Sequence, residues 1–215
     1  MCGIFAYSGA KDPLATCVKG LKWIESRGYD SAGIAWLNEG KILHCKKKGS
    51  VDNLIKSLQK AENSSLRLAI GHTRWATHGK ANDANAHPHL DESDQFAIVH
   101  NGIIENYADL KKSLIKSNKT FSSDTDTEVI VQLIRHQYDG DSLKAFSSAL
   151  QILQGSYAIV LIDKDRPDTL LAAAKESPLA IGCDKDHKEY FLSSDPNAFL
   201  GKNLEVTFLK ERQIA

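Results

Sequence analysis

Residues 2–8 read Cys-Gly-Ile-Phe-Ala-Tyr-Ser, a short apolar run at the very start of the sequence. Such a run predicts a buried strand over residues 3–8. Cys2 stands in front of this strand and becomes the first residue once Met1 is removed, which is efficient when the second residue is small. The chain end would then carry a thiol and a free α-amine, with ordinary pKa values of about 8.5 and about 7.7–8.0. The amine can take the thiol proton, so one residue can supply both nucleophile and base. The alternative is an inert, buried cysteine.

The composition is that of an ordinary globular domain. The chain has 215 residues, 42% of them hydrophobic, with 27 Lys plus Arg against 27 Asp plus Glu. That length suits one domain with a real core, and no repeat or linker divides residues 2–215. A net charge of zero argues against a nucleic-acid partner, which would need a basic surplus on one face. The basic run Lys46–Lys48 is interpreted as the solvated edge of a strand.

Neither a membrane span nor a leader is expected. No apolar run approaches the roughly 20 residues that cross a bilayer, and the first residues lack the features of a signal peptide. We therefore expect a cytoplasmic protein, in which the four cysteines stay reduced. Cys17, Cys45 and Cys183 lie in apolar runs and are expected to be small core residues.

Hydrophobic patterning predicts α+β architecture with antiparallel sheets. A hairpin is expected from strands 31–37 and 41–47 around Asn38-Glu39-Gly40. Helices are expected after Asp12, Ser50, Asn106, Asp124 or Thr125, and Ser142, each a good N-cap residue. The stripe on the second helix is Val51, Leu54, Ile55 and Leu58. Further strands are expected at 66–72, 96–100, 156–163, 169–174, 180–183, 189–193 and 205–209. The polar stretch 73–94 is long enough to predict a functional loop.

Five further blocks carry the chemistry. They are Arg27-Gly-Tyr-Asp-Ser-Ala-Gly33, His72-Thr-Arg-Trp-Ala-Thr-His-Gly79, Asn85-Ala-His-Pro-His89, His100-Asn-Gly-Ile-Ile-Glu-Asn106 and Thr125-Asp-Thr-Glu-Val129. With Cys2-Gly3-Ile4 they resemble, in order, the glutaminase domain of class II glutamine amidotransferases. Within that class they resemble the glutamine–fructose-6-phosphate aminotransferases. Tyr29 favours this aminosugar branch, because the purine-pathway amidophosphoribosyltransferases typically carry Gln there. The resemblance covers residues 2–209 and implies the four-layer αββα sandwich of N-terminal-nucleophile (Ntn) hydrolases.

The resemblance also implies how glutamine is held. Arg74 would grip the substrate carboxylate in a two-bond fork, and Asp126 would take the ammonium. The alternatives are a surface arginine and an aspartate that serves only its own helix start.

Asn101 and Gly102 are implied as the oxyanion hole, one through its side-chain amide and one through its backbone N–H. They are expected at a sharp turn after a strand. The alternative is a plain Asn-Gly turn.

Residues 74–79 resemble the family's glutamine loop, with Gly71 and Gly79 as hinges. Trp75 would cover the site, Thr77 would contact glutamine and His87 would line the pocket. His89 and His100 are expected to support the loop, and Arg27 and residues 29–31 to buttress the site from below. The histidines match no metal-binding spacing, so neither a metal nor another cofactor is expected.

The expected reaction is hydrolysis of L-glutamine to glutamate and ammonia through a Cys2 thioester. In the family, a downstream sugar-isomerase domain of the same polypeptide uses that ammonia to make glucosamine 6-phosphate from fructose 6-phosphate, and the full-length enzyme is expected to be a homo-oligomer. Two alternatives stay open: the glutaminase domain of another class II amidotransferase, such as an amidophosphoribosyltransferase, or a non-catalytic domain that only binds glutamine. The nucleophile itself depends on removal of Met1.

Overall fold

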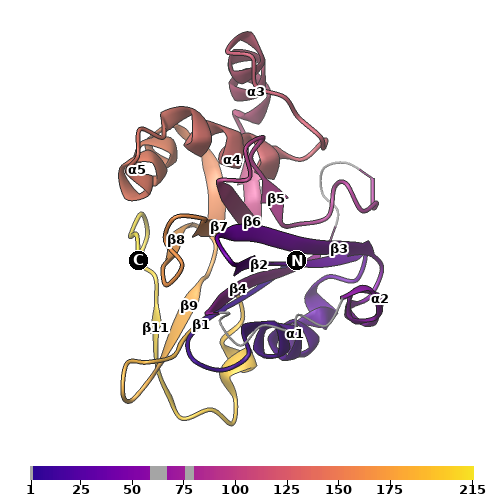
Figure 1. The fold of residues 1–215 in the computed structure, drawn as a ribbon, viewed down its shortest axis with the longest axis vertical. Helices are drawn as coiled ribbons and strands as arrows, with labels where there is room; N and C mark the ends of the chain where they lie inside the picture. Colours follow the sequence, from indigo (N-terminus) through magenta and orange to yellow (C-terminus); the bar gives the residue numbers. More distant parts are fainter. Residues whose placement is uncertain (1, 59–66, 76–79) are drawn as a thin grey trace.

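Two antiparallel sheets lie face to face in the computed structural model, which describes residues 2–58, 67–75 and 80–215 (Figure 1). The larger sheet has the order β11-β9-β10-β1-β4-β2-β3 and the smaller one β5-β6-β7-β8. The strands of the larger sheet are β11 Leu204–Phe208, β9 Ala180–Asp184, β10 Tyr190–Ser193, β1 Gly3–Ser8, β4 Leu68–Arg74, β2 Ser31–Asn38 and β3 Lys41–Lys48. In the smaller sheet they are β5 His89–Leu90, β6 Phe96–Ile104, β7 Gly155–Asp163 and β8 Leu170–Lys175.

Helices cover the two outer faces. Figure 1 shows α1 and α2 on the side of the larger sheet and α3, α4 and α5 beyond the smaller one. Their bounds are α1 Pro13–Trp23, α2 Val51–Ser57, α3 Tyr107–Lys116, α4 Asp126–Gln137 and α5 Ser142–Ile152, with short 3₁₀ turns η1 Glu25–Arg27 and η2 Pro196–Phe199. The order helix, sheet, sheet, helix is the αββα sandwich that the family resemblance implies.

Alternation along the strands explains the four layers. In β1, Phe5 and Tyr7 pack in the core under α1, whereas Ile4 and Ala6 pack in the core between the sheets. Successive strand residues point to opposite faces, so a strand buried on both faces must be apolar throughout. This requirement accounts for the unbroken apolar run at the start of the chain.

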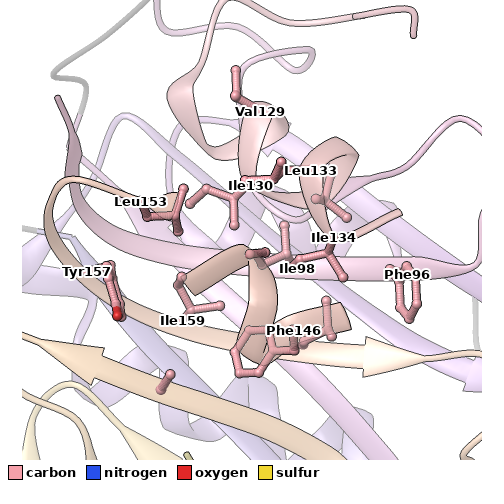
Figure 2. Close-up of a cluster of buried hydrophobic side chains, with 14 of the residues drawn as sticks. Phe96, Ile98, Val129, Ile130, Leu133, Ile134, Phe146, Leu153, Tyr157 and Ile159 are labelled. Carbon is pink, nitrogen blue, oxygen red and sulfur yellow. The ribbon is translucent and has the colours of Figure 1, made fainter. Parts of the chain in front are cut away.

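A third core joins the smaller sheet to its helices. Figure 2 shows Ile130 and Ile134 of α4 above Ile98 of β6 and Ile159 of β7, and all four are fully buried. Ile130 and Ile134 have the i, i+4 spacing that places side chains on one helix face. This core anchors the first turn of α4, which carries Asp126.

The helix starts confirm some of the predicted caps and correct others. Asp12 accepts a hydrogen bond from Ala15 N at 3.1 Å, and Thr125 accepts one from Glu128 N at 3.3 Å. Asp141, not Ser142, caps α5, because its carboxylate reaches Lys144 N at 3.1 Å.

Ser50 and Asn106 stand at the N-cap positions of α2 and α3 but make no capping bond with their side chains. At α2 the neighbouring Glu25 accepts from Val51 N at 2.7 Å instead. The stripe predicted on α2 is also wrong at Ile55, which is 40% exposed, whereas Val51 and Leu54 are buried.

The strand predictions are right in number and close in extent, with two exceptions. The two-residue β5 was not predicted. β6 does not end at His100 but continues through Asn101 and Gly102 to Ile104, paired with β7 throughout. The sharp turn expected at Asn101-Gly102 is therefore wrong. Instead, both residues lie inside a strand.

The cysteines are free thiols. Cys17 and Cys183 are buried as expected, and Cys45 is half-buried against the core under α1. In the described ranges, no helix is long and apolar enough to cross a bilayer.

Candidate active site

Three neighbouring strands bring Cys2, Arg74 and Asn101 together. Cys2 precedes β1, and the β1–β4 register pairs Gly3 with Thr73. Cys2 therefore lies beside the end of β4, where Arg74 is the last strand residue and Trp75 follows. Asn101 comes from β6 in the facing sheet. Cys2 thus meets two residues that lie more than seventy positions further along the chain.

The thiol of Cys2 is held by the backbone of Trp75. Trp75 N donates to Cys2 Sγ at 3.2 Å, and Sγ lies 3.4 Å from Trp75 O. Burial raises the pKa of the Cys2 thiol, and the Trp75 N–H and the charge of Arg74 act in the opposite direction. The N–H aimed at sulfur favours the thiolate, the form that attacks.

Asn101 reaches the same residue from the other sheet. Its Nδ2 donates to Cys2 O at 3.0 Å. One of the two amide hydrogens makes this bond, so a second hydrogen is left to donate. The two contacts fix Cys2 between the end of β4 and the middle of β6.

Gly102 occupies a position that only glycine fits. Its φ is +130°, and a Cβ there would lie 2.1 Å from Ser156 O on the paired strand. Any side chain would push β6 away from β7. The glycine is thus explained by strand geometry, and its backbone N–H adjoins Asn101.

The Arg74 side chain is almost fully buried. Only 4% of its surface is exposed, with Nη1 4.0 Å from Asp30 Oδ1 and 3.5 Å from Lys80 O. Both distances are too long for strong bonds. A guanidinium can form a two-bond fork with a carboxylate.

Asp126 is tied to the same strand as Asn101. It is the first residue of α4, which Thr125 caps, and its Oδ2 accepts from Ile104 N at 2.9 Å. The carboxylate does not cap its own helix. It is 6% exposed, so a negative charge lies three residues along β6 from Asn101.

His87 has both ring nitrogens engaged inside the protein. Nδ1 accepts from His100 N at 3.4 Å, and Nε2 contacts Thr127 Oγ1 at 3.2 Å. The ring is buried and stacks on His72 at 4.0 Å between centroids. The protein itself therefore occupies both ring nitrogens, and the backbone of His87 is what remains to contact a substrate.

Trp75 presents its ring to solvent at the mouth of the site. The ring is 47% exposed and meets that of Tyr29 edge-on at 5.1 Å between centroids. Thr77, His78 and Gly79 lie outside the described residues.

Arg27 lies beside Cys2 and forms an ion pair with Asp195, in which Nη1 is 3.0 Å from Oδ2. Its Nε lies 3.5 Å from Cys2 O, beside the Asn101 contact.

His72 is a residue of the site to which the sequence analysis assigned no role. It is fully buried, and its Nε2 lies 3.0 Å from Asn101 Oδ1 and 3.1 Å from His100 O. Its place in the strand that begins with the apolar residues 68–70 was a usable signal, since a polar group buried in a strand needs a partner.

His89 contacts Thr125 Oγ1 at 3.0 Å. Across the described ranges, no three His, Cys, Asp or Glu side chains converge as metal ligands. A large cavity of about 1040 Å³ opens beside α1, lined by Lys19, Trp23 and Leu204 among others, and shares no residue with this site.

Comparison with known families settles the class of protein. A family model described as a glutamine amidotransferase domain matches residues 72–201. The chain belongs to this family.

This glutamine amidotransferase domain is similar to part of several curated enzymes. It is 50% identical over its whole length to the glutamine–fructose-6-phosphate aminotransferase (isomerizing) of Chlamydia caviae. It is 48% identical, over 98% of the chain, to that of Pyrococcus horikoshii, and 46% identical over its whole length to that of Caldanaerobacter subterraneus. The match covers 35% of each of these relatives. The domain therefore spans about a third of their length.

Solved structures support the fold. The allosteric regulatory enzyme of purine biosynthesis superposes with a TM-score of 0.82 at 27% identity, over 98% of this domain and 45% of that chain. The glutamine phosphoribosylpyrophosphate amidotransferase of B. subtilis gives 0.78 at 27% identity over the same shares. The Ntn-hydrolase sandwich inferred from the sequence is thus confirmed.

Proposed function

We propose that this domain hydrolyses L-glutamine to glutamate and ammonia, with Cys2 as the nucleophile. The observation that carries the proposal is the meeting of residues 2, 75 and 101. Trp75 N–H points at the sulfur, and the Asn101 amide lies beside the same residue from the facing sheet. A nucleophile next to preorganised donors is the arrangement that acyl transfer requires.

In this proposal, removal of Met1 creates the free α-amine of Cys2 before catalysis begins. The α-amine of Cys2 takes the thiol proton, and the sulfur attacks the side-chain carbonyl carbon of glutamine. The oxygen of the resulting tetrahedral intermediate carries the negative charge, and the free hydrogen of Asn101 Nδ2 and the N–H of Gly102 stabilise it. When the C–N bond breaks, the α-ammonium returns its proton to the departing ammonia. Water, deprotonated by the same amine, then cleaves the thioester to glutamate and restores the thiol.

Arg74 and Asp126 select the substrate in this proposal. The buried guanidinium binds the α-carboxylate, and the carboxylate on β6 binds the α-ammonium. Trp75 covers the bound substrate with its exposed ring, and water exclusion follows from that cover. Thr77 and the backbone of His87 complete the substrate contacts.

The larger reaction belongs to a longer protein. We propose that residues 2–215 form the glutaminase domain of a polypeptide with a downstream sugar-isomerase domain, which uses the ammonia to convert fructose 6-phosphate to glucosamine 6-phosphate in the cytoplasm as a homo-oligomer. The relatives at 43–50% identity, about three times as long, support this acceptor. The lower identity to amidophosphoribosyltransferases makes their acceptor the second choice.

A labelling experiment tests the nucleophile directly. A diazoketone analogue of glutamine should add to one residue, and intact mass and peptide mapping should place it on Cys2 of chains that lack Met1. Cys2→Ala should abolish both labelling and glutaminase activity. A domain that only binds glutamine would stay unlabelled, and that outcome would contradict the proposal.

A matched control isolates the role of the α-amine. A chain carrying two extra residues before Cys2 keeps the thiol but moves the amine away. We expect it to fold with the same unfolding midpoint and to lose activity by several orders of magnitude. Cys17→Ala, a buried thiol under the larger sheet, should leave the activity unchanged.

A further inference from the structure

A buried histidine determines which way the Asn101 amide faces. Asn101 Nδ2 and Oδ1 can exchange places by a half-turn of the amide, and only one orientation puts a donor toward Cys2. Two contacts fix the choice. Cys2 O can only accept, so the atom 3.0 Å from it must be Nδ2. The oxygen must then face His72.

The same reasoning fixes the proton on His72. Its Nε2 lies 3.1 Å from His100 O, which can only accept, and 3.0 Å from Asn101 Oδ1. Nε2 must therefore carry the hydrogen and share it between the two oxygens. In the neutral ring Nδ1 is then unprotonated. This atom is buried without a hydrogen-bond partner in the described part of the chain.

We propose that His72 is a positioning residue for glutamine hydrolysis, in which its Nε2–H holds Asn101 Oδ1 so that Asn101 Nδ2 faces Cys2 and the oxyanion. This rests on the proposed glutaminase function. His72 does not touch the reacting atoms, and it acts only through Asn101. With the ring turned or removed, the amide can flip and present an oxygen to the developing negative charge.

The surroundings keep the His72 ring in place. The His87 ring stacks against it at 4.0 Å with an angle of 22° between the planes. Since His87 Nδ1 accepts from His100 N, its Nε2 carries the hydrogen and donates to Thr127 Oγ1. Backbone and hydroxyl groups thus hold His87, and His87 holds the face of His72. Burial lowers the pKa of His72 to about 3, so the ring stays neutral at working pH.

A double-mutant cycle provides the kinetic test. We expect His72→Leu to lower kcat for glutamine roughly 10²-fold, the loss typical of a catalytic group about 1 Å out of place, while KM changes little. In an Asn101→Ala background, the same substitution should change kcat less than threefold. If the kcat losses of His72→Leu and Asn101→Ala multiply in the double variant, His72 supports the fold and the proposal is overturned.

A conservative variant separates position from packing. Glutamine at position 72 can place an amide N–H where imidazole Nε2–H lies, so His72→Gln should keep kcat within about fivefold of the wild type. His89→Gln is the matched control, because the His89 side chain is also buried but contacts Thr125 and not Asn101. A loss in His72→Gln as large as in His72→Leu would count against the proposal.

A third measurement does not depend on activity. Long-range ¹H–¹⁵N spectra of histidine-labelled wild-type domain should show, besides the Nε2–H ring expected for His87, a further neutral Nε2–H ring that persists from pH 5 to 9 and disappears in His72→Gln. An Nδ1–H tautomer at His72 would overturn the inference even if the domain hydrolyses glutamine. A domain without glutaminase activity would instead refute the proposed function and leave the tautomer intact.

Discussion

The side-chain amide of Asn101 donates to the backbone carbonyl of Cys2 at 3.0 Å and so links the two sheets at the nucleophile. The bond leaves one amide hydrogen free, which is the hydrogen that an oxyanion needs.

Asn101→Ala should therefore lower kcat for glutamine by about 10²–10³-fold, or about 2.7–4 kcal/mol, because one oxyanion donor is lost. Steady-state kinetics with glutamate detection would measure it. Asn106→Ala is a matched control five residues away, whose amide bonds Ile152 O and Gln154 N outside the site. It should lower the unfolding midpoint and spare kcat. Equal losses in both variants would mean that Asn101 acts on stability alone.

Arg74→Lys should raise KM for glutamine by about 10–100-fold, since a single ammonium replaces a two-bond fork to the carboxylate. The fold-decrease in kcat should be smaller than the fold-increase in KM. Isothermal titration in the Cys2→Ala background would measure affinity without turnover. Arg135→Lys, in an ion pair with Asp91 on the far side of α4, should leave the affinity unchanged. Unaltered binding in Arg74→Lys would remove Arg74 from the substrate site.

Gly33→Ala should disturb the site from the middle of β2. A Cβ at Gly33 would lie 2.0 Å from His87 O, so the backbone that lines the proposed pocket must shift. Overpacking of this kind typically costs about 1–3 kcal/mol, and we expect KM for glutamine to rise as well. Urea unfolding and kinetics would measure the two effects. Gly40→Ala meets no atom within 4 Å and strains only its own turn, at φ +71°, so it should change stability without changing KM.

Stability should fall as the pH drops below about 6.5. Burial lowers the pKa of His72 to about 3 and those of His87 and His89 well below their ordinary value. The unfolded chain takes up protons at these rings below about pH 6.5 while the folded one does not, so the free energy of unfolding decreases with falling pH. Each such ring contributes a slope of about 1.4 kcal/mol per pH unit.

Urea midpoints from pH 7 to pH 4 would measure this slope in the wild type and in His72→Gln. The variant should be flatter by one ring's contribution over that range. His136→Gln, an exposed position on α4, should keep the full slope. An unchanged slope in His72→Gln would show that His72 is already protonated in the folded protein at those pH values.

Local sequence signals predicted most of the fold because the elements that carry it are locally encoded. The unbroken apolar run of β1 and the Asp12-Pro13 start of α1 depend on neighbouring residues only. The turn predicted at Asn101-Gly102 was wrong because the cause lies far away in the sequence. Gly102 is required by the close approach of Ser156, which lies 54 positions away, and an Asn-Gly pair in a sequence cannot distinguish this requirement from a turn.

The candidate site residues were predicted from the family resemblance, whereas their contacts follow only from the fold. The blocks around Arg74 and Asn101 point to glutamine chemistry through their resemblance to a family. Asp126 could equally have capped α4, and only the fold turns it toward Ile104 N. The bond from His72 to Asn101 joins β4 to β6 across the two sheets, and no spacing along the chain encodes it.

β1 is the central strand of the seven-stranded sheet, with β10 on one side and β4 on the other. Cys2 follows directly from that strand and lies against the backbone of Trp75. Pairing on both edges of β1 fixes the direction in which the backbone runs from Gly3 back to Cys2. In the proposed reaction the base is the α-amine of Cys2, so the assembled sheet sets the position of the base as well as that of the sulfur.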